Sequence, residues 1–247
     1  MSKKVFDEYA AKAGQPVSAT VLAGRYPSQV AAEKEIVTDI VAKLDLQSDD
    51  LFFEIGCGPG SLLVPISFLV RSAAGLDHPE MIDLINRKCP GLDLNLFGAD
   101  FIDYPVEKEV YSKILVYSVL QCLESLDQAI FFCRKAFGAL KTGGLMLLGD
   151  IPNLDMKNRF LGSERGKKFH AQWVAHMADT PENVAEYKNE YRNRAIVAPL
   201  RRWQPNDKDL DILVNALKDD GAEVFVLPQR KTLPFGNTRC DVLVEKL

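Results

Sequence analysis

The stretch LFFEIGCGPGSLL, from Leu51 to Leu63, decides how the rest of the sequence is interpreted. Its first five residues have the almost continuous apolar pattern of a strand that is covered on both faces of a parallel sheet. Three glycines spaced two apart follow, and an apolar run after them predicts a helix. A glycine-rich turn between a strand and a helix lets a ligand approach the backbone closely. We therefore expect a ligand site at this turn.

The spacing of the glycines separates several kinds of ligand. A dinucleotide fingerprint is G-x-G-x-x-G, whereas Gly56, Gly58 and Gly60 form G-x-G-x-G. A phosphate-binding P-loop ends in Gly-Lys-Ser/Thr, and no lysine follows Gly60. Glu54, two residues before the first glycine, would repel a pyrophosphate and attract an ammonium group. The turn therefore favours an adenosine that carries an amino acid.

Strands and helices alternate along most of the chain, which predicts β-α-β units and a parallel, doubly wound sheet. A helix over 210–217, closed by Gly221, precedes two strands at 222–227 and 240–247 whose short connection favours an antiparallel pair. The remaining expected strands are 51–55, 72–77, 92–100, 113–118 and 145–150, and the remaining expected helices are 28–44, 62–70, 79–87, 125–140 and 164–178.

The predicted fold class is α/β: a Rossmann-like, mostly parallel seven-stranded sheet with an antiparallel C-terminal strand. We expect one domain over 1–247, with an N-terminal helical gate at 1–45 and a cofactor-binding core at 46–151 and 207–247. Residues 152–206 would form a helical insert between the fifth and sixth strands, and its role as a substrate lid or a subunit contact is left open.

Composition argues against several classes of protein. The chain has 247 residues, of which 47% are hydrophobic and 26% charged, as in a globular protein with a sizeable core. A net charge of −4 gives no footprint for nucleic acid, and no apolar run approaches the roughly 20 residues that cross a bilayer. Five scattered cysteines without C-x-x-C argue against a zinc site or a disulfide frame, and MSKKVFDEYA lacks signal-peptide features. We expect a cytoplasmic protein without metal, nucleic-acid or membrane partners; a homo-oligomer stays open.

With these residues the sequence resembles the class I S-adenosylmethionine-dependent methyltransferases, over most of 28–151 and the C-terminal strand pair. The resemblance implies S-adenosyl-L-methionine as cofactor, with the glycine turn facing its methionyl part and Asp77 accepting both ribose hydroxyls. It also implies that Asp100 and Phe101 hold the adenine, and that residues 117–121 line the methyl-donating centre. The implied cofactor residues are Glu54, Gly56, Cys57, Gly58, Gly60, Asp77, His78, Met81, Asp100, Phe101, Tyr117, Ser118 and Gln121.

Simpler structural roles stay open for three of these residues. Asp77 could cap the helix that begins at Pro79, and Asp100 could be a turn acid. Cys57 fits a small residue that fills a turn better than a nucleophile.

The insert at 152–206 suggests the class of methyl acceptor. It has ten basic and six acidic residues, hence +4, which leaves −8 on the remainder. Arginine forks match phosphate and carboxylate, so the insert favours an anionic acceptor, although a solvated helix surface is the alternative. His170 and His176 are candidate general bases, or else buried structural histidines. Candidate substrate-binding residues are Arg25, Tyr26, Trp173 and Arg201.

The sequence therefore predicts methyl transfer to an oxygen or nitrogen of a small, anionic metabolite. The Asp/Asn-Pro-Pro-Tyr signature of amide and exocyclic-amine methylation is absent after the fourth expected strand, which disfavours DNA and protein acceptors. A non-catalytic sensor or complex subunit that binds S-adenosylmethionine or S-adenosylhomocysteine is the alternative, because the sequence shows no compelling base. A nicotinamide-dependent reductase is disfavoured by the glycine spacing and Glu54.

Overall fold

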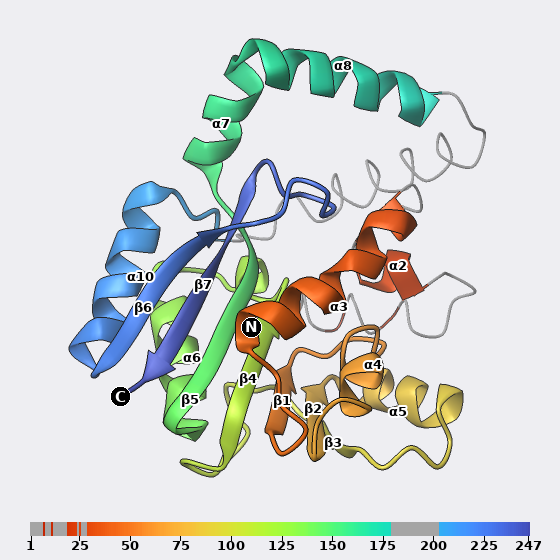
Figure 1. Cartoon of the computed structure of the whole chain (residues 1–247), viewed down its shortest axis with the longest axis vertical. Coiled ribbons are helices and arrows are strands. Elements are labelled where there is room, and N and C mark those ends of the chain that lie inside the picture. The colour runs from red at the N-terminus through yellow and green to blue at the C-terminus, as the bar shows by residue number, and fades with distance from the viewer. Residues whose placement is uncertain (1–6, 8–10, 12–18, 24, 26–28, 179–202) are drawn as a thin grey trace.

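The computed structural model describes residues 7, 11, 19–23, 25, 29–178 and 203–247. They contain a seven-stranded sheet in the order β3-β2-β1-β4-β5-β7-β6 (Figure 1). Strands β1 to β5 are parallel to one another, whereas β7 is antiparallel to both β5 and β6, which confirms the predicted fold class. The strands are β1 (Leu51–Ile55), β2 (Ser72–Asp77), β3 (Asn95–Gly98), β4 (Tyr111–Tyr117), β5 (Leu140–Pro152), β6 (Ala222–Pro228) and β7 (Arg239–Lys246).

Helices cover both faces of the sheet, and each face has its own apolar core. Phe52 and Phe53 are adjacent in β1 and fully buried, and they belong to different cores because successive strand residues point to opposite faces. One face is covered by α3 (Val30–Leu44), α4 (Leu63–Ser67) and α5 (Pro79–Lys88), and the other by α6 (Leu126–Ala139) and α10 (Asp207–Asp219).

Local sequence explains where several of these helices begin and end. The Ser125 hydroxyl accepts a hydrogen bond from the Gln128 amide at the start of α6, which is one half of a capping box. The Gln128 side chain returns to the Glu124 amide, one residue earlier than a standard box. After α10, Gly221 has a φ of +90°, the left-handed conformation that glycine adopts without strain.

Two predicted elements differ in the structure. The helix expected over 62–70 is limited to Leu63–Ser67, and Phe68, which is 72% exposed, adds no buried surface that would extend it. Residues 141–144, which lie between the expected helix over 125–140 and the expected strand over 145–150, are instead an irregularity within β5. Tyr111 pairs with Leu140 but Lys113 pairs with Leu145, so the additional residues bulge out of the ladder.

Helices α7 (Leu154–Gly162) and α8 (Glu164–Ala178) follow β5 and rise beyond the carboxyl end of the sheet (Figure 1). Helix α8 confirms the helix predicted over 164–178. Residues 179–202 of the expected insert lie outside the described residues. None of the described helices has the length and apolarity needed to cross a bilayer.

Close packing around β2 gives a test of the core. A Cβ on Gly75 would lie 2.4 Å from Leu63 Cδ2 and 3.1 Å from Cys57 Sγ. We expect Gly75→Ala to lower the free energy of unfolding by about 1–3 kcal/mol, because the added methyl overpacks this region. Gly138→Ala in the last turn of α6, where a Cβ meets nothing within 4 Å, should raise it by about 0.5–1 kcal/mol. Urea denaturation measures both changes, and equal losses would contradict the packing argument.

Candidate cofactor site

A pocket lies at the carboxyl ends of β1, β2 and β4, the sheet edge where ligands bind in open α/β folds. The N-terminal segment closes one side of it through Leu22, Ala23 and Arg25. Nine of the predicted cofactor residues line this pocket: Glu54, Gly56, Cys57, Gly58, Asp77, Met81, Tyr117, Ser118 and Gln121.

The glycine turn is tied to the neighbouring strand by its backbone. The amides of Gly56 and Cys57 both donate to the Leu76 carbonyl, at 2.7 and 3.2 Å. Gly56 has a φ of +81°, and a Cβ there would lie 2.4 Å from Val119 Cγ2. Glycine is therefore required at this position both by conformation and by space.

Asp77, at the end of β2, holds the turn and faces the pocket. Its Oδ2 accepts from the Gly58 amide at 2.7 Å and its Oδ1 from the His78 amide at 2.6 Å. Burial raises the pKa of Asp77 above its ordinary value, and these two hydrogen bonds oppose the increase. A carboxylate has about four acceptor positions, so both oxygens can still accept from a ligand. The alternative role as helix cap is wrong, because the His78 imidazole accepts from the Glu80 amide and caps α5.

Two buried groups of opposite charge line the same pocket. The Glu54 side chain is 2% exposed, and its Oε2 has no hydrogen-bond partner among the described residues. Burial, and then the charge of Asp77, raise the pKa of Glu54 well above its ordinary value, while Arg25 opposes this. The Nε of Arg25 is buried and also lacks a partner among the described residues. A pocket with one unpaired acceptor and one unpaired donor matches a zwitterionic amino acid.

Arg25 is positioned from two directions. Its Nη1 lies 3.0 Å from Glu33 Oε1 in α3, and its Nη2 donates to Ser118 Oγ at 3.5 Å. The guanidinium also lies 5.7 Å from the centre of the Tyr117 ring. Arg25 thus links the N-terminal segment to the end of β4.

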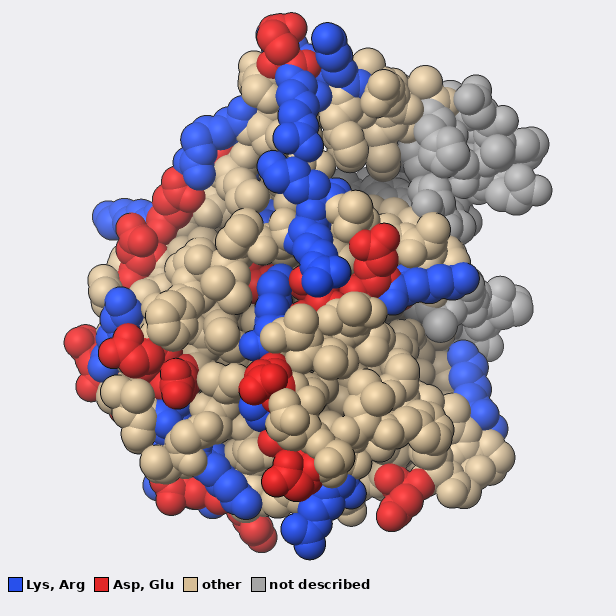
Figure 2. Space-filling view, viewed as in Figure 1, with Lys and Arg blue, Asp and Glu red and all other residues tan. Residues whose placement is uncertain are grey.

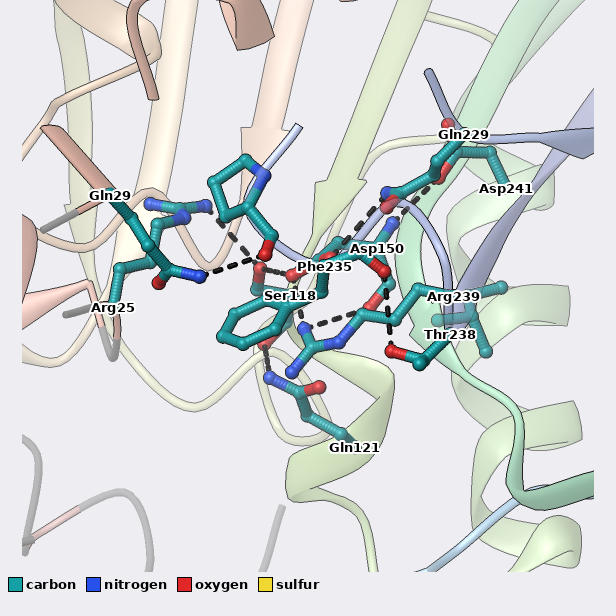
Figure 3. A network of polar contacts seen from close by, with 12 residues as sticks. Arg25, Gln29, Ser118, Gln121, Asp150, Gln229, Phe235, Thr238, Arg239 and Asp241 are labelled. Carbon is teal, nitrogen blue, oxygen red and sulfur yellow. Dashed lines mark hydrogen bonds and ion pairs between the residues drawn. The ribbon is translucent and has the colours of Figure 1, made fainter. Parts of the chain in front are cut away.

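A polar network continues from Ser118 to the end of β5 (Figure 3). The Ser118 hydroxyl donates to Asp150 Oδ2, and Arg239 from β7 forms an ion pair with the same oxygen. Gln121 Nε2 donates to the Ser118 carbonyl at 3.2 Å. Sequence reasoning missed Asp150 and Arg239, although LMLLGD ends in an acid at a strand end, as SAAGLD does. No motif marks Arg239.

Four predicted cofactor residues lie outside the pocket lining. Gly60 packs behind the turn, where a Cβ would be 3.1 Å from Val64 Cγ2, and His78 caps α5. Phe101 is 3% exposed and packs on Phe132 at 4.7 Å between ring centres, so only its backbone is left to flank a base. Asp100 lies two residues after Gly98, the β3 partner of Asp77, and accepts from the Ile102 amide.

The structure separates the candidate base His170 from this pocket. His170 is exposed on α8 and stacks with Trp173 at 6.4 Å between ring centres, and neither residue lines the pocket. The alternative of a buried structural histidine is also wrong for His170. The side chain of His176, and the candidates Tyr26 and Arg201, lie outside the described residues. No group of three or more His, Cys, Asp or Glu in the described part of the chain could hold a metal ion.

Comparison with known families agrees with this geometry. A family model described as a methyltransferase domain matches residues 53–148, from within β1 to within β5. Residues 53–148 thus match a methyltransferase domain, in agreement with the resemblance to the class I S-adenosylmethionine-dependent methyltransferases. Among curated proteins, no sequence matches the chain.

Solved structures share the fold of this chain at low sequence identity. A Haloferax volcanii putative methyltransferase in complex with the Trm112 activator is 12% identical, with a TM-score of 0.64 over 97% of this chain and 98% of that chain. The phosphoethanolamine N-methyltransferase 1 of Haemonchus contortus, with phosphoethanolamine and S-adenosylhomocysteine, is 11% identical, with a TM-score of 0.67 over 99% and 48%. The geranyl diphosphate C-methyltransferase of Streptomyces coelicolor, with Mg2+, geranyl diphosphate and S-adenosylhomocysteine, is 11% identical, with a TM-score of 0.59 over 100% and 99%.

The raised pKa of Glu54 makes a prediction about the stability of the protein. The folded state holds the Glu54 proton more tightly than the unfolded state, so its contribution to stability falls as pH rises from the ordinary carboxyl range through the raised pKa. Glu54→Gln removes this contribution. The free energy of unfolding of the variant, relative to the native protein, should therefore increase across that pH window. Urea denaturation at a series of pH values measures the difference, and a pH-independent difference would contradict the burial argument.

Proposed function

We propose that the protein transfers the methyl group of S-adenosyl-L-methionine to an oxygen or nitrogen of a small, anionic metabolite. The observation that carries the proposal is the presence of Glu54 and Arg25 in one pocket, each buried with a polar atom that has no partner in the described part of the chain. The amino-acid end of the cofactor has one ammonium and one carboxylate, which would satisfy both groups at once.

The remaining contacts follow from the order of the strands. Asp77, at the end of β2, would accept the ribose hydroxyls with the lone pairs that Gly58 and His78 leave. Asp100 follows β3, the next strand in the sheet, and would accept from the adenine amine. Arg25, expected from sequence to bind the acceptor, is reassigned to the cofactor carboxylate by this arrangement.

The chemistry requires alignment and the exclusion of water more than acid or base groups. When bound, the cofactor supplies an activated methyl carbon: the acceptor lone pair forms the new bond, the carbon–sulfur bond breaks with its electrons on sulfur, and the positive charge passes to the acceptor, which then releases a proton. Tyr117 and Val119 are 5% and 6% exposed and surround Ser118 with apolar surface at this position. The end of β4 thereby limits the access of water.

The anionic character of the acceptor rests on the charges beyond the carboxyl edge. Helices α7 and α8 contain five basic residues and two acidic ones, and Figure 2 shows Lys and Arg side chains gathered on the upper part of the molecule, where these helices lie. Phosphoethanolamine and geranyl diphosphate, the molecules named with two of the similar structures, both carry phosphate. Phosphorylated and carboxylated metabolites are therefore the acceptors to test first.

Calorimetric titration with S-adenosylmethionine tests the cofactor site. We expect Asp77→Asn to weaken binding about tenfold or more, because a charge-assisted contact to the ribose is lost. Asp93→Asn, which removes an exposed carboxylate between α5 and β3, should have no effect. Unchanged affinity in Asp77→Asn would contradict the assignment of the ribose site.

Labelled methyl transfer into phosphorylated and carboxylated metabolites then tests the activity. Incorporation that depends on Asp77 supports the enzyme. Tight binding of the cofactor without transfer to any metabolite would instead favour the sensor role.

A further inference from the structure

We propose that the Ser118 hydroxyl recognises the methyl acceptor, and that it does so as a hydrogen-bond acceptor. The site then selects a nucleophile that carries an N–H or O–H, such as an amine, an alcohol or a phenol. This inference rests on the proposed methyl transfer and identifies the chemical class of its acceptor atom. It makes Ser118 a specificity-determining residue, with Asp150 as the residue that positions it.

Ser118 is the point at which the end of β4 meets the pocket. Its flanking residues at 113–117 and 119–120 are buried, whereas Ser118 is partly exposed and lines the pocket. Its amide donates to the Gly149 carbonyl at 3.1 Å, which fixes the backbone against β5. The hydroxyl therefore has a defined position beside the methyl-donating region.

The polarity of this hydroxyl is set by Asp150 (Figure 3). A hydroxyl has one proton, and Ser118 donates it to Asp150 Oδ2. Arg239 also donates to this carboxylate oxygen, so both of these partners of Asp150 Oδ2 are donors. Arg25 Nη2 also donates to Ser118 Oγ, at 3.5 Å. With its proton used in this way, Ser118 offers a ligand only a lone pair.

The backbone of Asp150 is itself held in place from β7 and the β6–β7 connection. The Asp150 amide donates to Asp241 Oδ1 at 2.8 Å, and Gln229 Nε2 donates to the same Asp241 oxygen at 2.9 Å. Lys43 from α3 lies 2.6 Å from Asp241 Oδ2. Asp150 and Asp241 are 4% and 0% exposed, so the Ser118 partner has little freedom to turn away.

Methyl transfer strengthens a hydrogen bond from the acceptor to Ser118. Positive charge builds on the nucleophilic atom as the new bond forms, so its N–H or O–H becomes a better donor in the transition state. A carboxylate oxygen, a thioether or a carbon nucleophile has no such donor and would face the Ser118 lone pair unpaired. The anionic group of the acceptor therefore binds away from Ser118, and the nucleophile is a separate group.

A second Ser–Asp pair in the same chain serves as a matched control, because it tests whether such a pair only joins neighbouring strands. At the opposite end of β4, Ser112 Oγ donates to Asp50 Oδ1 at 2.7 Å and accepts from the Leu51 amide at 2.9 Å. Neither Ser112 nor Asp50 lines the pocket. Ser118→Ala and Ser112→Ala therefore remove similar contacts, but only the first is made at the ligand site.

The experiment measures the binding of paired probes to protein saturated with S-adenosylhomocysteine, using ligand-observed NMR. Phenol and benzylamine carry the donor, whereas anisole and benzoate do not. We expect the native protein and Ser112→Ala to prefer the donor probes, and Ser118→Ala to lose about tenfold of that preference. Affinity for S-adenosylmethionine, measured by calorimetry, should stay within about twofold in Ser112→Ala, because Ser112 does not line the pocket.

Asp150→Ala provides a test that a loss of folding cannot imitate. Without the carboxylate, the serine proton is free to turn toward the pocket, which should shift preference from phenol to benzoate. Absence of donor-probe binding to the native protein, equal behaviour of Ser118→Ala and Ser112→Ala, or a folded Asp150→Ala that still prefers phenol would each overturn the inference. A native protein that fails to bind S-adenosylmethionine would contradict the proposed function itself, which separates the two failures.

Discussion

The buried carboxyl group of Glu54, whose Oε2 has no hydrogen-bond partner among the described residues, is the constraint around which the pocket is organised. Burying a charge without a partner is costly, and the fold responds by raising the pKa of Glu54. Asp77 adds a second acid to the same cavity, and Arg25 compensates only in part. A ligand that brings an ammonium and a sulfonium relieves this imbalance. Cofactor affinity and folded-state stability are therefore linked through one side chain.

The fold places these groups together because parallel strands end at a common edge. Residues 54, 77, 100 and 150 are far apart in sequence, yet each lies at or just beyond the carboxyl end of one of four strands in this sheet. Strand patterns and the glycine turn are local signals, so the sheet, the pocket edge and nine of its residues were predictable. The unsatisfied atoms of Arg25 and Glu54 were not, because they depend on how the N-terminal segment packs over the pocket.

Other features depend on contacts that the sequence pattern does not specify. The position of Phe101 directly after an acid near a strand end is compatible with a ring that flanks a ligand and with a ring that enters the core. The contact of its ring with Phe132 in α6 shows that it enters the core. Helical periodicity in 164–178 correctly predicts α8 but does not say what the helix packs against, and Phe169 is 46% exposed there. Arg239 reaches Asp150 only because β7 lies beside β5.

The ends of the neighbouring strands β4 and β5 have a strained backbone that carries polar side chains. Ser118 and Asp150 have φ values of +61° and +60°, a region that costs a residue with a Cβ about 1–2 kcal/mol. Gly149, just before Asp150, is required for a different reason, because a Cβ there would lie 2.3 Å from the Tyr117 ring. Gly149 thus occupies the position where a Cβ has no space. Ser118 and Asp150 occupy positions with a positive φ, where the backbone of a glycine would be less strained. Their mutual hydrogen bond needs both side chains, so the strain is best explained by what that bond does at the pocket.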